Sequence, residues 1–185
     1  MLILASSSKT RAKILKDNGV VFRQIGVDFD EDSIKESDPK SFVYKATVGK
    51  FEASNKDELP LLVADTVLDI DGKIIRKAKD EDDARRILEL QSGNSLSIIT
   101  CMIYHDRDLH LLDLSQTRYN FYKFDSKDLD EYLKSGEWIG KAGACMVEGF
   151  CKKYIKSVQG YESTAMGLCV EKLLPFLDRR CIKKS

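Results

Sequence analysis

Hydrophobic residues along the chain follow two periods, one typical of strands and one typical of helices. Short apolar or alternating runs between turn residues predict strands, and apolar residues every three or four positions predict helices. The predicted strands cover residues 1–5, 20–27, 60–70, 73–75, 96–104, 109–114, 118–124 and a short run that ends at 160. The predicted helices cover residues 8–18, 41–54, 80–90, 129–135 and 170–177.

Turn residues indicate how these elements connect. Asp71-Gly72 is a two-residue turn of the kind that joins antiparallel strands, and Asp106-Arg107 marks a second reversal of the chain. Strands and helices alternate while hairpins interrupt them, which predicts an α/β or α+β protein with a mixed sheet. Because no repeat, low-complexity tract or long linker divides the sequence, residues 1–185 are expected to form one domain.

Composition argues against several classes of function. Thirty lysines and arginines balance thirty aspartates and glutamates, so the chain lacks the broad basic surface of a protein that binds duplex DNA or RNA. No apolar run is long enough to span a membrane, and the first residues lack the features of a signal peptide. Five cysteines form no C-x-x-C pair, and two histidines are too few for a zinc site of imidazoles and thiolates. We therefore expect a soluble cytoplasmic protein with reduced thiols.

The junction of the first strand and the first helix is the first candidate site. The apolar run MLILA leads directly into SSSKTR at residues 6–11. Backbone N–H groups at a helix N-terminus, serine hydroxyls and the Arg11 guanidinium would converge there, as they do in anion-binding sites. A phosphate-bearing ligand is one interpretation of this corner. The other is that the serines only cap the helix.

Four further segments place charge or small residues at unusual positions. Asp65 interrupts the central predicted strand, where a carboxylate serves as a general base, as a magnesium ligand, or only as a cap at a strand end. The basic run 76–79 follows the hairpin and lies close to that strand. Lys141 precedes small residues at 142–144, which let a backbone approach a ligand. Lys50 lies on the second predicted helix. Each of these last three segments also has a purely structural interpretation. The run 76–79 would be a solvated turn, the segment 141–144 a tight bend, and Lys50 a side chain that reaches solvent.

The order and spacing of these segments resemble the Maf family of nucleotide pyrophosphatases, formerly described as septum-formation inhibitors. The family's S-x-S-P-R-R corner corresponds to residues 6–11, and its G-A-D-T strand corresponds to VADT at 63–66. Its acidic pair corresponds to Asp30-Glu31, and its helix lysine to Lys50. The remaining similar segments are RKAKD at 76–80, LQSG at 90–93, GKAGA at 140–144 and MGLC at 166–169. The resemblance covers nearly the whole chain.

The resemblance implies both a fold and an activity. The fold would be α/β, with a long twisted mixed sheet and flanking helices in two lobes around a cleft, similar to inosine triphosphatases. The activity would be hydrolysis of a nucleoside triphosphate, non-canonical or modified, between its α and β phosphates. The products would be a monophosphate and pyrophosphate, and the cofactor would be a divalent metal, Mg²⁺ or Mn²⁺. Relatives resemble homodimers, although no patch in this sequence predicts the contact.

The resemblance also implies roles for individual residues. The residues expected to act in catalysis are Asp65, as proton acceptor, with Lys77 and Lys50. The residues expected to bind the substrate phosphates are Ser6, Ser8, Arg11 and Lys141. Those expected to select or position the base are Thr10, Thr66 and Glu148. The residues expected to hold the metal ion are Glu31 and Asp65.

The chain departs from the family pattern at positions that bear on the substrate. Lys9-Thr10-Arg11 replaces P-R-R, and Gly140 replaces an aspartate. Glu148 resembles the branch that acts on 7-methyl-GTP, whereas the branch that acts on dTTP and UTP has glutamine. A glutamate can accept two hydrogen bonds from a guanine edge, whereas glutamine offers a donor and an acceptor. The preferred base stays open, as do two alternatives, a catalytically weak nucleotide-binding relative and an interaction protein of cell division.

Overall fold

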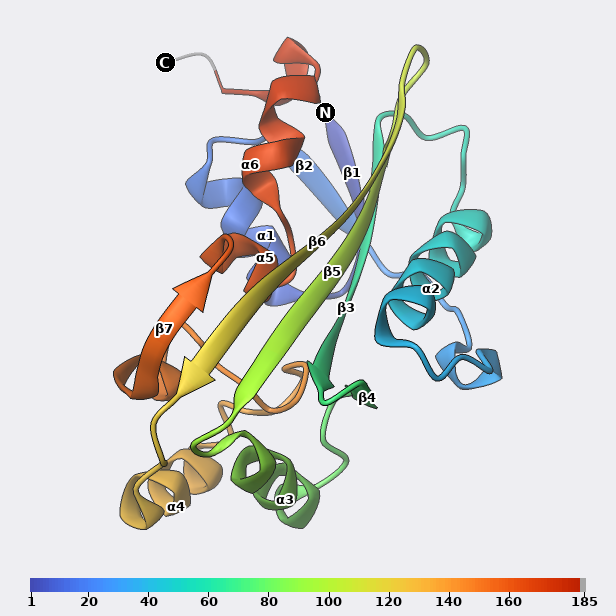
Figure 1. Cartoon of the computed structure of the whole chain (residues 1–185). Coiled ribbons are helices and arrows are strands. Elements are labelled where there is room, and N and C mark those ends of the chain that lie inside the picture. Colours follow the sequence, from blue (N-terminus) through green and yellow to red (C-terminus); the bar gives the residue numbers. More distant parts are fainter. Residues whose placement is uncertain (184–185) are drawn as a thin grey trace.

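A seven-stranded mixed sheet forms the centre of the structure, a computed structural model that describes residues 1–183 (Figure 1). Lys184 and Ser185, the last residues of the expected domain, lie outside the described residues. The strands are β1 (Leu2–Ala5), β2 (Phe22–Ile25), β3 (Leu61–Ile70), β4 (Lys73–Ile75), β5 (Ser95–His105), β6 (His110–Phe121) and β7 (Ile155–Gln159). Their order is β2-β1-β3-β5-β6-β7, and β4 pairs with β3. The first three strands run parallel and the other pairs are antiparallel, which confirms the predicted mixed sheet.

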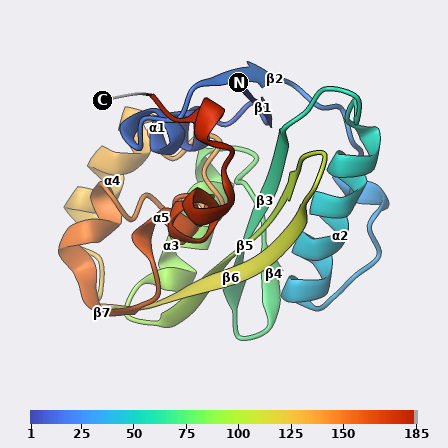
Figure 2. The same cartoon turned by 90° about the horizontal axis from the view of Figure 1, so that it is seen from above.

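Helices cover both faces of this sheet. They are α1 (Lys9–Asp17), α2 (Pro39–Ala53), α3 (Glu81–Gln91), α4 (Ser126–Ser135), α5 (Glu162–Ala165) and α6 (Val170–Leu173), with 3₁₀ turns η1 (Glu31–Ser33), η2 (Phe150–Tyr154), η3 (Leu174–Phe176) and η4 (Arg179–Cys181). Seen from above, α2 lies on one side of the sheet and α1 and α5 lie on the other (Figure 2). None of the helices within residues 1–183 has the length and apolar character needed to cross a membrane.

Capping side chains determine where the main helices begin. The side chains of Ser8, Asp38, Asp80 and Asp125 accept hydrogen bonds from backbone N–H groups in the first turns of α1, α2, α3 and α4. Such a cap satisfies one of the donors that a helix start leaves unpaired. Because Asp38 and Asp125 are the caps, α2 and α4 begin earlier than the apolar pattern alone predicts. Pro39 fits the first position of α2 because that position needs no N–H partner.

Alternate residues of β3 point to opposite faces of the sheet, as in any strand. Val63 and Val67 pack on the α2 face, against side chains such as Phe51 and Val43. The residues of β3 that pack on the opposite face with α1 and α6 are Leu62 and Ala64. The same alternation directs Asp65 toward α2 and Thr66 toward α1.

The pairing of β3 is continuous on one side and interrupted on the other. β5 pairs with it from Leu61 to Asp69. On the opposite side β1 pairs with Leu61 and Leu62, and β4 pairs with 68–70. In the part of the chain that the structure describes, no strand pairs with residues 63–67 on that side. We call this opening the sheet gap, and the chain turns from β1 into the 6–11 corner beside it.

One strand is longer than the sequence predicts. β6 is continuous where the apolar pattern predicts two segments, 109–114 and 118–124. The polar residues between them stay in the ladder because their hydroxyls find partners. Thr117 Oγ1 donates to a backbone carbonyl at 2.6 Å, and Ser115 Oγ accepts from a lysine of α6 at 2.8 Å. Buried polar groups that are hydrogen-bonded in this way are compatible with a sheet.

The structure confirms the turn predicted at 71–72 and contradicts part of the helix predicted at 170–177. In the turn, Asp71 has φ 51° and Gly72 has φ 75°, both in the left-handed region, and the two residues join β3 to β4. The predicted helix 170–177 is wrong in its second half. α6 ends at Leu173, and Pro175 lies in the 3₁₀ turn that follows. Proline lacks the N–H that a longer helix would need.

Candidate active site

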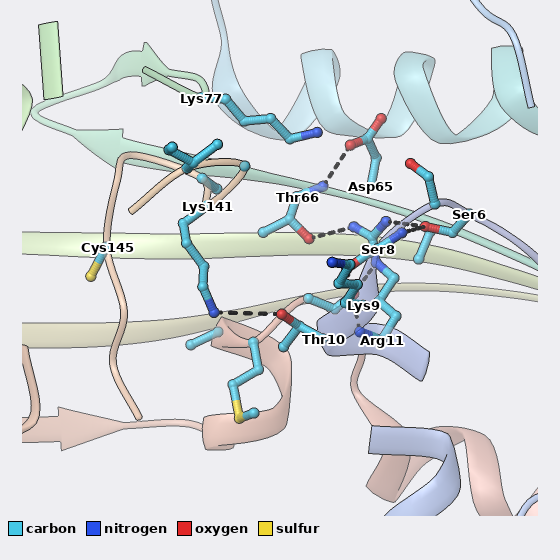
Figure 3. Close-up of a pocket in the computed structure, with 18 of the residues that line it drawn as sticks. Ser6, Ser8, Lys9, Thr10, Arg11, Asp65, Thr66, Lys77, Lys141 and Cys145 are labelled. Carbon is cyan, nitrogen blue, oxygen red and sulfur yellow. Dashed lines mark hydrogen bonds between the residues drawn. The ribbon is translucent and has the colours of Figure 1, made fainter. Parts of the chain in front are cut away.

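A cavity of about 510 Å³ opens beside the sheet gap (Figure 3). Its walls come from the 6–11 corner, α2, the centre of β3, the segment after β4 and the loops before η2 and after α5. The predicted site residues on these walls are Ser6, Ser8, Thr10, Arg11, Lys50, Asp65, Thr66, Lys77, Lys141 and Glu148. Glu31 does not line the cavity and contacts it through Lys50. The structure therefore brings together segments that are far apart in the sequence.

Lys50 joins two carboxylates at one end of the cavity. Its Nζ lies 2.5 Å from Glu31 Oε1 and 2.5 Å from Asp65 Oδ2. The other oxygen of Asp65 accepts the N–H of Thr66 at 2.9 Å, so both oxygens of this carboxylate are fixed. Only 12% of the Asp65 side chain and 16% of the Lys50 side chain are exposed. The strand and the helix thus hold a largely desolvated charge cluster, in which ion pairs are stronger than at the surface.

Glu31 gains a second cation from the segment after β4. Arg76 donates from Nη2 to Glu31 Oε2 at 2.9 Å and also pairs with Asp32. Burial acts to raise the pKa of Glu31, but the hydrogen bonds and positive charges of Lys50 and Arg76 outweigh burial and hold the pKa below its usual range. Glu31 is therefore a carboxylate at neutral pH.

The donor set at this end fits a magnesium ion that binds together with phosphate. Mg²⁺ commonly uses one or two carboxylates, completed by water and substrate phosphate oxygens. Glu31 and Asp65 meet at the same ammonium group and could supply those carboxylates. Within residues 1–183, no cluster of three or more His, Cys, Asp or Glu side chains could hold a metal alone. The protein thus offers a partial ligand set rather than a complete cage.

Arg11 connects three parts of the site. Its Nε donates to the carbonyl of Gly167 at 2.7 Å, Nη1 to Ser6 Oγ at 2.9 Å and Nη2 to Thr66 Oγ1 at 3.0 Å (Figure 3). Burial lowers the pKa of Arg11, while the charges of Asp65 and Glu31 act to raise it. Arginine nevertheless stays protonated in proteins. Two of its five N–H groups remain without a partner among the described residues, so Arg11 orders the corner and still has donors for a ligand.

A serine of the 6–11 corner caps the first helix, and the serines also line the cavity. Ser8 Oγ accepts the N–H of Arg11 at 3.3 Å, which makes Ser8 the N-cap of α1. Ser6 Oγ accepts the N–H of Ser8 at 3.3 Å in addition to the Arg11 bond. The start of α1, with its partial positive charge, is thus directed at the cavity.

Thr66 is placed by a chain of hydroxyl groups. Thr100 Oγ1 donates to the carbonyl of Thr164 at 2.7 Å, and the hydroxyls of Thr66 and Thr100 lie 2.9 Å apart. The Thr66 hydroxyl must therefore be the donor to Thr100 while it accepts from Arg11. These contacts give Thr66 a role in holding Arg11, and its expected role in base selection stays a prediction.

A second ion pair lies at the other end of the cavity. Lys141 Nζ donates to Glu148 Oε1 at 2.7 Å. The same Nζ approaches Thr10 Oγ1 at 3.5 Å (Figure 3). Apolar side chains of Ile139 and Met166 line the cavity with them. Two of the residues expected to select the base therefore share one lysine.

The Lys77 and Lys141 segments lie side by side. Lys77 forms an isolated bridge with Ala142, and the N–H of Gly143 donates to the carbonyl of Arg76 at 3.0 Å. The side chain of Lys77 extends toward Asp65 and Thr66 (Figure 3). Gly143 has φ 60°, and a Cβ there would lie 2.4 Å from Leu68 Cδ2. The small residue at this position lets the loop approach β3.

Sequence reasoning missed two residues that hold these segments. Arg76 belongs to the basic run 76–79, but no local sequence signal predicts its pairing with Glu31. Gln91 is fully buried at the end of α3 and donates from Nε2 to the carbonyl of Gly143 at 2.6 Å. A glutamine on the apolar face of a predicted helix is the signal that could have indicated this contact.

The fold and the site define an α/β protein with a cleft in which lysines pair with fixed carboxylates beside the N-terminus of a helix. A family profile described as Maf-like protein matches residues 1–180. This chain belongs to the Maf-like protein family, which confirms the resemblance that the ordered motifs predicted.

Curated relatives extend the match to nearly the full length of the chain. A protein of Nitratiruptor sp. is 56% identical over 178 residues, which cover 94% of this chain and 96% of the relative. A protein of Helicobacter pylori (strain G27) is 41% identical and covers 94% and 93%. A protein of Campylobacter jejuni subsp. doylei is 38% identical and covers 96% and 100%. All three are named nucleoside triphosphate pyrophosphatase.

Proposed function

We propose that this chain is a nucleoside triphosphate pyrophosphatase, which hydrolyses the bond between the α and β phosphates and releases pyrophosphate. The observation that carries the proposal is the Lys50 cluster, where one ammonium fixes Asp65 and Glu31 at the edge of a cation-lined cavity. The names of relatives that match 94% or more of the chain support the same activity.

Asp65 is proposed as the residue that activates water. Its two oxygens are fixed by Lys50 and by the N–H of Thr66, so the carboxylate keeps one orientation toward the cavity. It would orient a water molecule and accept its proton as the water oxygen attacks the α phosphorus. The bond from that phosphorus to the bridging oxygen then breaks, and pyrophosphate leaves with the electron pair.

Cations and hydrogen-bond donors would hold the triphosphate. A nucleoside triphosphate carries about four negative charges near neutral pH, and electrostatic stabilisation is often the largest contribution to such a reaction. The groups proposed to contact the phosphates are Lys77, Lys141, Arg11, Ser6, Ser8 and the N-terminus of α1. Lys50 and Lys77 would neutralise charge that develops near Asp65.

A divalent metal ion, Mg²⁺ or Mn²⁺, is proposed as the cofactor. Glu31 and Asp65 would hold it together with phosphate oxygens, because these are the ligands that hard cations prefer. When bound, such an ion neutralises phosphate charge and lowers the pKa of bound water. The lysine between the two carboxylates keeps them from repelling each other when no ion is present.

The preferred substrate is proposed to be a non-canonical or modified nucleotide. The end of the cavity with Glu148, Lys141 and Thr10 would receive the base, and the apolar side chain of Ile139 would contact its face. Thr66, behind Arg11, would influence the base only indirectly. Glu148 can accept hydrogen bonds from a guanine edge, which favours a guanine nucleotide such as 7-methyl-GTP over dTTP or UTP.

Several wider features belong to the same proposal. Residues 1–185 would form one domain in which two lobes flank the cavity, similar to inosine triphosphatases. The five free, buried cysteines agree with a reducing cytoplasmic location. A second copy of the chain is the proposed protein partner, in a homodimer.

Release of pyrophosphate across a panel of triphosphates tests the proposal. The panel contains the canonical nucleotides and 7-methyl-GTP, each with Mg²⁺, with Mn²⁺ and with a chelator. We expect equal amounts of monophosphate and pyrophosphate, no turnover with the chelator, and recovery when the metal is restored. Nucleotide binding without pyrophosphate release would overturn the proposal and favour the catalytically weak relative. Release of inorganic phosphate and a diphosphate would contradict the site of cleavage.

A further inference from the structure

The ring of Phe29 rests directly on the backbone of Gly49. A Cβ at position 49 would lie 2.1 Å from Phe29 Cζ and 2.3 Å from Cε2, far inside any contact distance that real side chains show. Gly49 lies within α2, where glycine is normally unfavourable compared with alanine. The close approach of an aromatic ring gives this glycine a physical reason.

This contact lies next to the charge cluster of the cavity. Lys50 follows Gly49 on α2, and Glu31 lies two residues after Phe29 on the segment 28–34. We call that segment the acidic strap. In Figure 1 it runs beside α2, on the side away from α1. The ring contact and the contact of Glu31 with Lys50 are therefore neighbours on both elements.

The acidic strap has little regular structure of its own. It contains only the 3₁₀ turn η1, in which the N–H of Asp32 donates to Asp30 Oδ1 at 2.9 Å. Ile34 packs at its far end against the apolar cluster around Val43. Glu31 thus lies between two apolar anchors, Phe29 and Ile34.

Ion pairs alone are a weak means of fixing such a segment. A quarter of the Glu31 side chain and 40% of the Arg76 side chain are exposed, and exposed pairs contribute little because water competes and side chains lose freedom. Ordering the backbone of a strap costs conformational entropy at each residue. Close packing of a ring on a helix offsets that entropy cost through van der Waals contact, and it leaves the charged groups of the strap free for their ion pairs.

We propose that Phe29 and Gly49 are positioning residues, which seat the acidic strap on α2 and so hold Glu31 against Lys50. The inference deepens the proposed function, since Glu31 is one of the two carboxylates offered to the metal ion. Phe29 and Gly49 need not touch the substrate. Their effect is exerted through the place of Glu31.

A cycle of substitutions separates this role from a general effect on folding. Gly49→Ala places a methyl group where the ring lies, and Phe29→Ala removes the ring. In the double variant the methyl group has room, although the strap has lost its anchor. The matched control is Gly26→Ala, because a Cβ at Gly26 has no atom within 4 Å.

Hydrogen exchange of the chain without nucleotide or metal is the first readout. We expect amides of residues 28–34 to exchange about tenfold faster in Gly49→Ala and in Phe29→Ala, while β3 amides are unchanged. The double variant should resemble Phe29→Ala alone, since both substitutions break one contact. Unchanged exchange in the strap of either single variant, or additive effects in the double variant, would overturn the inference.

The magnesium requirement is the second readout. The two single variants should need about tenfold more Mg²⁺ for half-maximal pyrophosphate release, with a smaller change at saturating Mg²⁺, and Gly26→Ala should match the wild type. An unchanged magnesium requirement in both variants would contradict the role of the contact in placing Glu31. If the wild type released no pyrophosphate, the proposed function would fail, whereas the exchange experiment would still decide the seating of the strap.

Discussion

The two ends of the cavity balance their charges in different ways. At the β3 end, Lys50 pairs with two carboxylates, Glu31 and Asp65. At the far end, Lys141 and Glu148 form a single pair. At the β3 end, one carboxylate can interact with water or a metal ion while the other still pairs with Lys50. At the far end, the single pair is neutral overall. This difference supports the proposal that the β3 end carries out the reaction and the far end recognises the base.

The two ends also differ in what supports them. Asp65 and Lys50 stand on a strand and a helix, and elements of this kind hold side chains accurately. The far end stands on the turns around residues 139–148, which side chains hold from outside. The Tyr132 hydroxyl donates to the carbonyl of Ala144 at 2.9 Å, and Gln91 holds the neighbouring carbonyl. Turns of this kind generally tolerate changes in sequence better than the strands and helices that they connect.

Removing the proposed base should produce the largest effect. Asp65→Asn keeps the size of the side chain and an oxygen for the N–H of Thr66, but it removes the proton acceptor. We expect kcat to fall by about 10²–10⁴-fold. Binding of nucleotide, measured by calorimetry, should change far less. Full turnover in this variant would show that Asp65 is not the base.

Arg11→Lys tests the connection that Arg11 makes between the 6–11 corner, β3 and the loop after α5. Lysine keeps the charge but cannot reproduce the three bonds to Ser6, Thr66 and Gly167. We expect the free energy of unfolding in urea to fall by about 2 kcal/mol, because buried acceptors lose their donors. Lys9→Ala, at an exposed neighbour, is the control and should change stability by less than about 0.5 kcal/mol. Equal stability of the two variants would contradict the connecting role of Arg11.

Glu148→Gln should alter recognition without stopping the reaction. The substitution replaces an acceptor pair with one donor and one acceptor, and it removes the charge opposite Lys141. We expect the ratio of kcat/KM for guanine nucleotides to that for uracil or thymine nucleotides to fall by about tenfold, the effect of one hydrogen bond. A uniform loss over all bases would mean that Glu148 only holds Lys141.

An exposed ion pair outside the cavity should show the smallest effect. Arg180 donates to Asp178 through its side chain and backbone, and these bonds lower the pKa of Asp178 from 3.8 to about 2. The stabilising effect of the pair is therefore present above the ordinary pKa and is lost as the pH falls toward 2. In Arg180→Ala, the pKa of Asp178, measured by NMR titration of its carboxyl group, should rise back toward 3.8. Activity at neutral pH should not change. A pKa that stays near 2 would contradict this cause.

The sequence predicted most elements because their signals are local. The apolar run of β1, the Ser8 cap of α1 and the turn at 71–72 each depend on neighbouring residues. The local pattern predicts a break in the strand at residues 115–117, but β6 is continuous there. The partners of their hydroxyls lie on α6 and near α5, far along the chain. Local patterns cannot indicate such partners.

The candidate site was predictable in its members but not in its contacts. Asp65, Lys50 and Lys141 stood out as charges among apolar or small residues, and the family resemblance supplied their expected roles. That Lys50 joins Asp65 to Glu31 depends on which face of α2 meets β3, which no spacing along the chain reveals. The contact of Phe29 with Gly49 is still harder to predict, because it depends on the ring occupying the space where a Cβ at position 49 would lie.

The sheet gap has a consequence for how the site tolerates the arrival of a ligand. Residues 63–67 are held along one side by β5 and are open on the other, so the strand is stiff in position while its free side faces the corner. A ligand entering there would not have to break a ladder of hydrogen bonds. The backbone of β3 can therefore hold a reacting group in a fixed position, and no backbone hydrogen bond of the sheet has to break when the ligand binds beside it. This is a form of preorganisation that the backbone itself provides.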